Sequence, residues 1–460
     1  MAAQAGHLPG GNITYTCQGG NVYTVTLTLF RDCQGAPMIS QALSFASDCG
    51  TTFVVNALAP GPGTEVSQLC PADLPNSSCN GGPLPGIEVY RYETTLGLAP
   101  CDGWTITWSE CCRNSSLNVS GNPGMTIEAR LNSATAPCNN SPTFTQDVIP
   151  YVCVGQPVTY NLGVTEPDGH ALRYRLTEAR NELGQPVAYL PGYSGQEPFA
   201  GMALDSLTGQ LTFTPTLLGN IITAVRVDEY DQNGDLAGSV MRDFLFVVVA
   251  CPNAPPDPAH GQPTLAQGDV VAIDTTAISV CPGAGFCADL TYSDPDAGQT
   301  LLLTSNVDAV VPGAQLTSTG SNPLAAVLCV PSAPLAEGTY GFVVTAADDG
   351  CPNTALTTYS YTLNVLPDTA AACLSTGIGA IKAPAALIFP SPARDRITVI
   401  TPDEVQAPLL LIDAQGRLAI TARTNGLRTV LDIQALAPGS YTVRTANGPP
   451  TVLGGFIKED

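Results

Sequence analysis

Val22-Tyr-Thr-Val-Thr-Leu-Thr-Leu-Phe30 alternates apolar and hydroxyl-bearing side chains with a period of two. Successive side chains of a β-strand point to opposite faces of the sheet, so this pattern predicts a strand with one buried face. Trp104-Thr-Ile-Thr-Trp108 repeats the pattern. Clusters of Gly, Pro and Asn at 61–63, 80–83 and 121–124 supply the backbone angles that tight turns need. The first third of the chain is therefore predicted to be a loop-rich β-sandwich.

The composition favours strands over the whole chain. Its 460 residues include 45 Gly and 40 Pro, and only 12% of them are charged, about half the usual share. Proline removes a backbone donor that a helix needs, and both residue types suit turns. At roughly 100 to 150 residues per domain, a chain of this length should hold three or four domains.

Two segments, 149–251 and 252–366, share a weak internal repeat. The acidic turn Glu166-Pro-Asp168 of the first matches Asp294-Pro-Asp296 of the second, and a glycine-led strand follows in each. Segments of about 100 residues with turns every 8 to 12 residues are typical of an immunoglobulin-like sandwich. We therefore predict an all-β protein of tandem β-sandwich (immunoglobulin/cadherin-like) modules with disulfides. The expected divisions are a cysteine-rich module at 12–148, sandwiches at 149–251 and 252–366, a linker at 367–386 and a small module at 387–460.

The chain is strongly acidic, with 39 Asp and Glu against 17 Lys and Arg and a formal charge of -22. This charge repels phosphate backbones, so we expect no nucleic-acid partner. The acidic turns could instead hold Ca²⁺, which prefers clustered oxygen ligands. Solvated hairpin tips without metal are the alternative. The first candidate site comprises Glu166, Asp168, Asp228, Asp231, Asn233 and Asp235, and the second comprises Asp294, Asp296, Asp348 and Asp349.

Sixteen cysteines without zinc-finger spacing predict disulfides in an oxidising compartment. Adjacent Cys111 and Cys112 are expected to reach two different strands rather than each other. The expected disulfide cysteines are Cys17, Cys33, Cys49, Cys70, Cys79, Cys101, Cys111, Cys112, Cys138, Cys153, Cys251, Cys281, Cys287, Cys329, Cys351 and Cys373.

Two pairing schemes stay open, because nine cysteines precede Cys153. In one, Cys153 pairs with one of the nine and leaves the last six as a closed set. In the other, Cys153 pairs with Cys251, and one of the nine needs a distant partner such as Cys373.

Catalytic motifs are missing from the sequence. The three histidines stand outside any H-E-x-x-H frame, and no G-x-S-x-G motif occurs, so we expect no enzymatic activity. Trp104 and Trp108, with Tyr90 and Tyr92, could line a sugar or protein groove, although alternating aromatics in a strand are more often core. No apolar run reaches the length of a membrane span, and Phe244–Ala250 is expected to be a buried strand. Met1-Ala-Ala-Gln-Ala is similar to the tail of a signal peptide, so we expect the leader to be missing from the given sequence.

The last module carries the most specific motifs: Phe389-Pro-Ser-Pro-Ala-Arg-Asp395, Asp413-Ala-Gln-Gly-Arg417, Leu436-Ala-Pro-Gly-Ser-Tyr441 and Phe456-Ile-Lys458. In this order they resemble the type A C-terminal sorting domain of type IX secretion substrates. One departure is Ser391, where that family usually has Asn. The resemblance implies export by the type IX machinery and display at the outer membrane. The sorting residues that it implies are Pro390, Pro392, Asp395, Asp413, Gly416, Gly439, Tyr441 and Lys458.

The N-terminal region carries a second resemblance. Thr14–Asn21, Tyr23–Cys33, Cys111–Asn114 and Cys138–Pro142 resemble the N-terminal region of Bacteroidota surface proteins associated with gliding motility. The triplets at 205–207, 274–276 and 368–370 resemble the O-glycosylation motif of Bacteroidota exported proteins. The acceptors implied are Ser206, Thr275 and Thr369.

Together these patterns predict a secreted, non-enzymatic structural or adhesive protein of the cell surface, with Ca²⁺ as the one candidate cofactor. Its expected partner is the type IX machinery, and surface glycans or other surface proteins are further candidates. Two alternatives stay open. The chain could be a carbohydrate- or protein-binding module, or a subunit that assembles into a filament by strand addition at sandwich edges.

Overall fold

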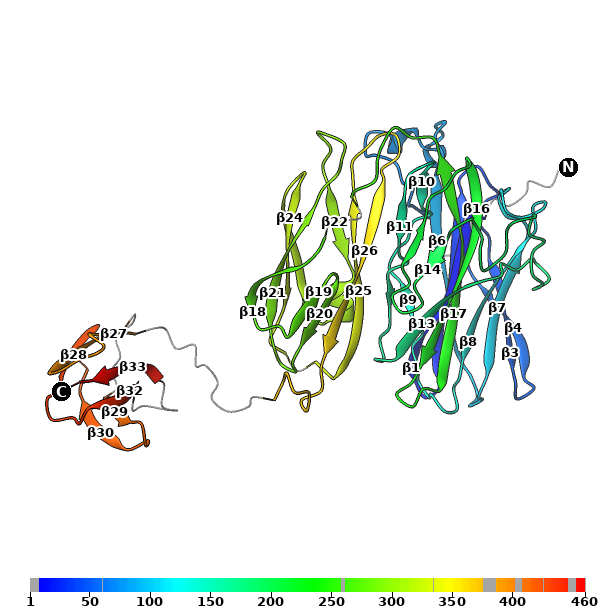
Figure 1. Ribbon diagram of the computed structural model, residues 1–460. Helices are drawn as coiled ribbons and strands as arrows, with labels where there is room; N and C mark the ends of the chain where they lie inside the picture. The colour runs from blue at the N-terminus through cyan, green and yellow to red at the C-terminus, as the bar shows by residue number, and fades with distance from the viewer. Residues whose placement is uncertain are drawn as a thin grey trace. The chain divides into compact units, whose positions relative to one another are not determined.

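The computed structural model describes residues 8–59, 61–257, 261–333, 335–374, 386–401, 408–424, 426–445 and 452–459. The chain forms two compact units, Met1–Cys373 and Leu374–Asp460. Strands dominate both (Figure 1), so the predicted all-β fold is confirmed. The short helical segments of the described residues are α1 (Val307–Val310), η1 (Leu74–Asn76) and η2 (Ser78–Asn80).

The first core is organised around one long strand, β17 (Leu236–Val249). One edge of β17 pairs with β16 (Gly219–Tyr230). Its other edge pairs in succession with β8 (Met125–Leu131), β1 (Gly10–Gly19) and, in parallel, β10 (Tyr151–Cys153). Residues 237–246 of β17 are all buried, and its second part, Phe244–Val249, is an unbroken apolar run typical of a strand covered on both faces.

Two branches of sheet leave β17 from this shared edge. One runs through β8, β7 (Trp104–Glu110), β3 (Gln41–Ser47) and β4 (Thr52–Ala57), and the other through β1, β2 (Val22–Asp32), β6 (Ile87–Gly97) and β5 (Thr64–Glu65). The predicted strand at 22–30 lies in β2, where Tyr23, Val25, Leu27 and Leu29 are all buried.

The second half of this core faces the sheet of β16 and β17. It consists of β9 (Thr143–Phe144), β11 (Val158–Tyr160), β12 (Val164–Thr165), β14 (Ala203–Leu204) and β15 (Leu211–Phe213), while β13 (Ala171–Thr177) pairs with β16. Tyr160 and Phe213 pack on Phe246 at ring-centroid distances of 5.5 and 4.8 Å. Aromatic contacts of this kind hold the two layers together.

The expected boundary at 148/149 does not separate two modules. Buried residues from Leu8 to Val248 form one hydrophobic cluster, because both branches pair with β17 and the second half packs against the same sheet. At Gly11 of β1, an added Cβ would lie 2.7 Å from both Ile127 Cδ1 and the Thr28 carbonyl oxygen. Glycine is thus needed at this position of β1, where β8 and β2 approach it closely.

The segment expected at 252–366, the third predicted module, forms a separate sandwich with its own core and is called the third sandwich below. One sheet has the order β18-β21-β24-β23 and the other β19-β20-β26-β25-β22. The bounds are β18 (Thr264–Gly268), β19 (Ala272–Asp274), β20 (Ala277–Val280), β21 (Phe286–Tyr292), β22 (Leu302–Ser305), β23 (Gln315–Gly320), β24 (Leu324–Val330), β25 (Gly338–Ala347) and β26 (Leu356–Val365).

The contact between this sandwich and the first core includes polar and covalent links. The Gln68 amide donates to the Thr354 carbonyl oxygen at 2.6 Å, and the Asn161 amide donates to Ser360 Oγ at 2.9 Å. Beside Gln68, a disulfide joins Cys70 to Cys351. This covalent link ties the two sandwiches into one unit.

The cysteines pair as Cys17–Cys138, Cys33–Cys79, Cys49–Cys101, Cys70–Cys351, Cys111–Cys112, Cys153–Cys251, Cys281–Cys373 and Cys287–Cys329. The scheme with Cys153–Cys251 is the one adopted. Its distant partner is Cys351, not Cys373, because Cys373 lies beside Cys281 after β26. Adjacent Cys111 and Cys112 pair with each other, contrary to expectation, and their Cα atoms lie 3.1 Å apart.

A buried ion pair lies at the centre of the first core. Asp243 of β17 has no exposed surface, and Arg113, which is 1% exposed, binds it through both terminal nitrogens, with Nη2 2.6 Å from Oδ2. Arg113 Nε and Nη2 also donate to the carbonyl oxygens of Gly124 and Arg180, each at 3.0 Å. Burial raises the pKa of the Asp243 carboxyl, an effect that Arg113 opposes.

The C-terminal unit is a small two-sheet module with its own core. Its sheets have the orders β27-β28-β31 and β30-β29-β32-β33. The bounds are β27 (Leu387–Phe389), β28 (Arg396–Ile400), β29 (Leu409–Asp413), β30 (Leu418–Ala422), β31 (Arg428–Asp432), β32 (Gly439–Thr445) and β33 (Val452–Lys458). Most of the predicted linker lies outside the described residues.

Candidate functional site

The sorting residues of the C-terminal unit lie close together although they are far apart in sequence. Asp413 of β29 pairs in register with Tyr441 of β32, which pairs with Phe456 of β33. The Tyr441 and Phe456 rings stack with centroids 5.5 Å apart, and the Tyr441 hydroxyl donates to the Ala437 carbonyl oxygen at 2.8 Å. Lys458 pairs with Gly439 in the same sheet.

The proline turn closes onto the last strand. The Ile457 amide donates to Ser391 Oγ at 3.1 Å, and the Ala393 amide donates to the Ile457 carbonyl oxygen at 2.8 Å. A serine oxygen therefore provides the turn contact at the position where the family usually has Asn. After the turn, the Asp395 carbonyl oxygen accepts a hydrogen bond from the Ile433 amide at 2.8 Å.

The β29–β30 hairpin is built by its aspartate. Asp413 Oδ1 accepts the amides of Gln415 and Arg417 at 3.0 and 2.9 Å, and Gly416 takes a positive φ of 81°. The backbone N–H of Arg417 is the main reason that the pKa of Asp413 lies below its usual value. The motif residues thus fix the turns of one compact module.

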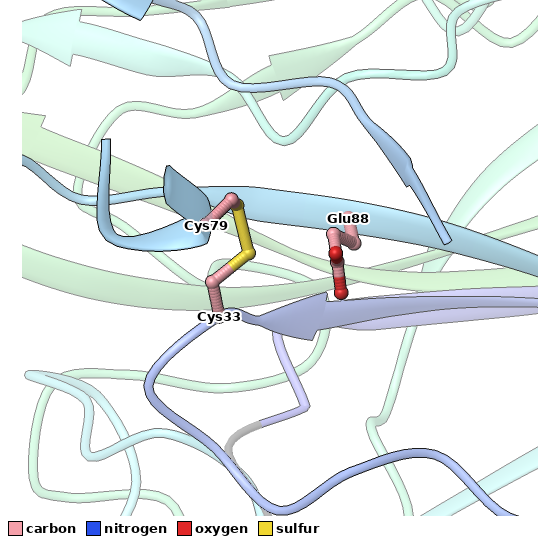
Figure 2. Close-up of side chains that lie close together, drawn as sticks. All are labelled: Cys33, Cys79 and Glu88. Carbon is pink, nitrogen blue, oxygen red and sulfur yellow. A yellow bond between two sulfur atoms is a disulfide. The ribbon is translucent and has the colours of Figure 1, made fainter. Parts of the chain in front are cut away.

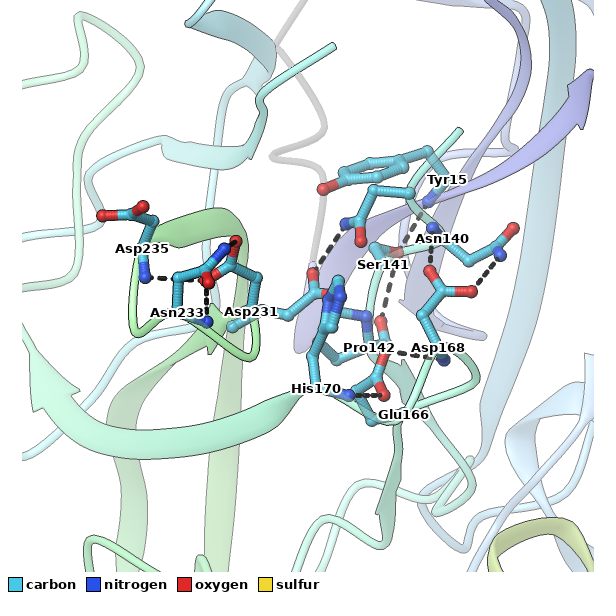
Figure 3. Close-up of polar contacts among 12 residues, drawn as sticks. Tyr15, Asn140, Ser141, Pro142, Glu166, Asp168, His170, Asp231, Asn233 and Asp235 are labelled. Carbon is cyan, nitrogen blue, oxygen red and sulfur yellow. Dashed lines mark hydrogen bonds and ion pairs between the residues drawn. The ribbon is translucent and has the colours of Figure 1, made fainter. Parts of the chain in front are cut away.

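A second site gathers four metal-ligating side chains in the first core. Glu166 and Asp168 follow β12, His170 precedes β13, and Glu229 lies in β16. One ligand atom from each lies within 4.8 Å of the others. Figure 3 shows the three turn residues converging beside the segment that carries Asn140.

Hydrogen bonds hold each of these carboxylates in place. Glu166 accepts the amides of Asp168 and His170 at 2.9 and 2.6 Å. Asp168 accepts the backbone N–H and the side-chain amide of Asn140 at 2.6 and 2.7 Å. Each carboxylate oxygen retains a further lone pair for a ligand.

Glu229 is the buried member of this group. Its side chain has no exposed surface, and its two oxygens lie 2.7 Å from His170 Nδ1 and 2.9 Å from Asn139 Nδ2. Burial, opposed by these hydrogen bonds, raises the pKa of Glu229 to about 7. Next to it, Asn139 is 3% exposed, and its Oδ1 has no hydrogen-bond partner.

The predicted calcium set at 166–235 is only partly brought together. Glu166 and Asp168 belong to the cluster, but Asp228 is held by Arg226 Nε at 2.6 Å and Arg175 Nε at 3.0 Å. Consecutive residues of a strand face opposite sides, so Asp228 points away from the site that Glu229 faces. The prediction missed both His170 and Glu229.

The hairpin residues of that set fold their own turn. Asp231 Oδ1 accepts the amides of Asn233 and Asp235 at 2.9 and 2.8 Å. Figure 3 shows this hairpin beside the cluster. Asp231, Asp168, His170 and Asn139 all line one surface hollow of about 280 Å³.

The second predicted calcium set, Asp294, Asp296, Asp348 and Asp349, forms hydrogen bonds near the start of the third sandwich. Asp296 Oδ2 accepts the Ala254 amide at 2.7 Å, and Asp349 Oδ1 accepts the Thr300 amide at 2.8 Å. Asp348 binds the Asn253 side-chain amide. Burial and the neighbouring Asp348, Asp296 and Asp349 raise the pKa of Asp294 to about 6. Calcium binding by this set stays a prediction.

Two further groups of ligand-type residues contain disulfides. Figure 2 shows Cys33 bonded to Cys79 beside Glu88, whose carboxylate lies 2.7 Å from Arg31 Nη1. Cys70 and Cys351 likewise form a disulfide beside Asp73. A metal needs thiolate, so neither group offers sulfur ligands while oxidised.

The remaining candidates differ in exposure. Trp104, Trp108, Tyr90 and Tyr92 are all buried, so they form core and line no open groove. The three implied glycosylation acceptors are exposed, and their modification stays a prediction. They are Ser206, Thr275 and Thr369.

Comparison with known protein families identifies the last module. Residues 387–459 match the family described as "Secretion system C-terminal sorting domain". The chain therefore carries a type IX sorting signal, which implies a secreted, surface-associated protein and an interaction with the type IX machinery. In the described part of the chain, no helix has the length and apolarity needed to cross a bilayer.

Comparison with solved structures finds alignments with low sequence identity and low TM-scores. A crystal structure of titin domains aligns at 12% identity over 69% of this chain and 96% of that one, with a TM-score of 0.17. Dimeric latent PorU from Porphyromonas gingivalis aligns at 15% identity over 69% and 33%, with a TM-score of 0.15. The N-terminal eight Ig domains of Down Syndrome Cell Adhesion Molecule align at 11% identity over 95% and 47%, with a TM-score of 0.16. No curated protein matches the sequence.

Proposed function

We propose that this chain is a non-enzymatic structural or adhesive protein, displayed at the outer membrane by the type IX system. The observation that carries the proposal is that one chain contains both a sorting module and a disulfide-braced unit of 373 residues. Eight disulfides and two buried cores make a stiff support outside the cell, where reduction does not reach them. The resemblance of residues 14–142 to gliding-motility-associated surface proteins supports the same location.

Self-assembly is the second candidate, and one strand favours it. β4 forms an outer edge of its sheet, and its sequence Thr-Phe-Val-Val-Asn-Ala carries no charge. Val54 on this edge is 61% exposed. Edge strands without charges or prolines can accept a strand from another chain. Replacing Val54 with Lys is expected to abolish ordered polymers in electron micrographs if this candidate is correct.

Attachment of cells tests the principal proposal. A strain that lacks the chain is expected to lose most of its attachment to surfaces or to other cells, and the full-length chain should restore it. The matched control is a restored chain carrying Asp102→Asn, an exposed carboxylate ahead of β7. Unchanged attachment in the deleted strain, or turnover of a polysaccharide by the purified chain, would contradict a structural or adhesive role.

A further inference from the structure

The group of Glu166, Asp168, His170 and Glu229 combines high negative charge with close spacing. Three carboxylates and one imidazole place ligand atoms within 4.8 Å of one another, close enough to share one ion. Among the described residues, His170 is the one basic side chain within ion-pair distance of these carboxylates, with Nδ1 2.7 Å from Glu229 Oε1. Like charges held this close repel in a partly desolvated site, and a bound dication would relieve that repulsion.

The surroundings of this group are organised around it. Asn140 binds both oxygens of Asp168, the turn amides bind both oxygens of Glu166, and Asn139 binds Glu229. Outer hydrogen bonds of this kind orient the ligands of metal sites. Since they are made by backbone and amide groups, the carboxylates are positioned without being neutralised.

An unpaired oxygen gives an independent indication of a ligand. Asn139 is 3% exposed, it lines the same hollow as Asp168 and His170, and its Oδ1 has no partner. A buried amide oxygen without a hydrogen bond is unfavourable unless something binds it. A hydrated cation in the hollow would supply that partner through one of its waters.

Tyr15 and Glu229 are packed tightly against Gly238. An added Cβ at Gly238 would lie 2.2 Å from the Tyr15 hydroxyl and 3.1 Å from Glu229 Oε2. The hydroxyl instead donates to the Arg130 carbonyl oxygen at 2.9 Å. Gly238 thus leaves the room in which Tyr15 and Glu229 pack side by side.

The chemistry of the ligands selects the ion. Ca²⁺ takes six to eight oxygen ligands, whereas one imidazole with carboxylates suits Zn²⁺ and its first-row neighbours. Four side chains are also the number that a tetrahedral zinc site uses. We propose that Glu166, Asp168, His170 and Glu229 bind one transition-metal dication of the zinc class.

The ion would join segments that are distant in the sequence. It would link the turn between β12 and β13 to β16, beside the 138–141 segment that the Cys17–Cys138 disulfide anchors to β1. Its role is therefore structural, and it goes beyond the proposed surface function. A higher affinity for Zn²⁺ than for Ca²⁺ would distinguish this site from the all-oxygen calcium sites that the sequence predicts at the acidic turns.

Titration of the metal-stripped full chain with Zn²⁺ and, separately, Ca²⁺ by isothermal calorimetry tests this proposal. We expect one Zn²⁺ per chain, bound at least tenfold more tightly than Ca²⁺, and a higher melting temperature with Zn²⁺. His170→Ala and Glu166→Gln should each weaken Zn²⁺ binding by about 10- to 100-fold. The exposed control Asp102→Asn should bind Zn²⁺ as the unmodified chain does.

Fluorescence of Trp104 and Trp108, both in this core, would show that each variant is folded. If one variant fails to fold, the other still decides. Zn²⁺ binding that neither folded variant weakens would overturn the proposal. So would Ca²⁺ binding as tight as Zn²⁺ binding and insensitive to His170→Ala.

Discussion

Asp243→Asn is expected to lower the free energy of unfolding of the first core by about 3–5 kcal/mol. The substitution keeps the shape of the side chain but leaves the Arg113 cation buried without its counter-charge. No water can replace the lost partner, since both side chains are at most 1% exposed. Urea titration followed by tryptophan fluorescence measures the effect, because the two tryptophans of the chain both lie in this core.

Asp147→Asn is the matched control for this substitution. Asp147 pairs with Arg91 on the surface, where the two side chains are 41% and 44% exposed. Surface ion pairs contribute at most about 1 kcal/mol, so the control should change little. Equal losses in the two variants would contradict the view that the buried pair is integral to this core.

Replacing Cys70 and Cys351 together with Ser is expected to uncouple the third sandwich from the first core. The two cysteines are 281 residues apart, and a disulfide closing so long a loop stabilises by roughly 3–5 kcal/mol, although Cys153–Cys251 shortens the effective loop. The links left at the contact include hydrogen bonds from Gln68 to Thr354, from Asn161 to Ser360 and from Gln146 to Thr345. Each such bond contributes only about 0.5–1.5 kcal/mol. Calorimetry should show the single transition of the intact unit split into two.

The control keeps the number of lost disulfides equal. Cys287 and Cys329 join neighbouring strands inside the third sandwich, 42 residues apart. Their replacement with Ser should lower the stability of that sandwich while leaving it coupled to the first core. A single unchanged transition in the Cys70/Cys351 variant would show that the contact holds without its covalent link.

Local patterns predicted the strands well and the partners of strands poorly. Alternation placed a strand at 22–30, and β2 occupies Val22–Asp32. The same reasoning placed a boundary at 148/149, where the structure has one shared core. The shared core forms because β17 pairs with β8, β1 and β10 along one edge. No local pattern in the sequence encodes which distant strands pair.

The candidate metal site shows the same limit at the level of side chains. Spacing in the sequence pointed to Asp228, yet the pleat of β16 turns it toward Arg226 and presents Glu229 to the site. A signal for His170 was available, since it directly follows the Glu166-Pro-Asp-Gly turn. For Glu229 the internal repeat gave a signal, since it stands ten positions after Gly219 as Asp348 does after Gly338. Which of the adjacent Asp228 and Glu229 faces the site depends on the register in which Glu229 pairs with Leu172 of β13.

Protease treatment of intact cells tests most directly whether the C-terminal module carries this chain to the exterior. Cells producing the full chain are compared with cells producing a chain that ends at residue 386. The account predicts that the full chain is cleaved from outside, whereas the shortened chain stays protected in the periplasm with its disulfides formed. A shortened chain that reaches the surface as efficiently as the full one would contradict it.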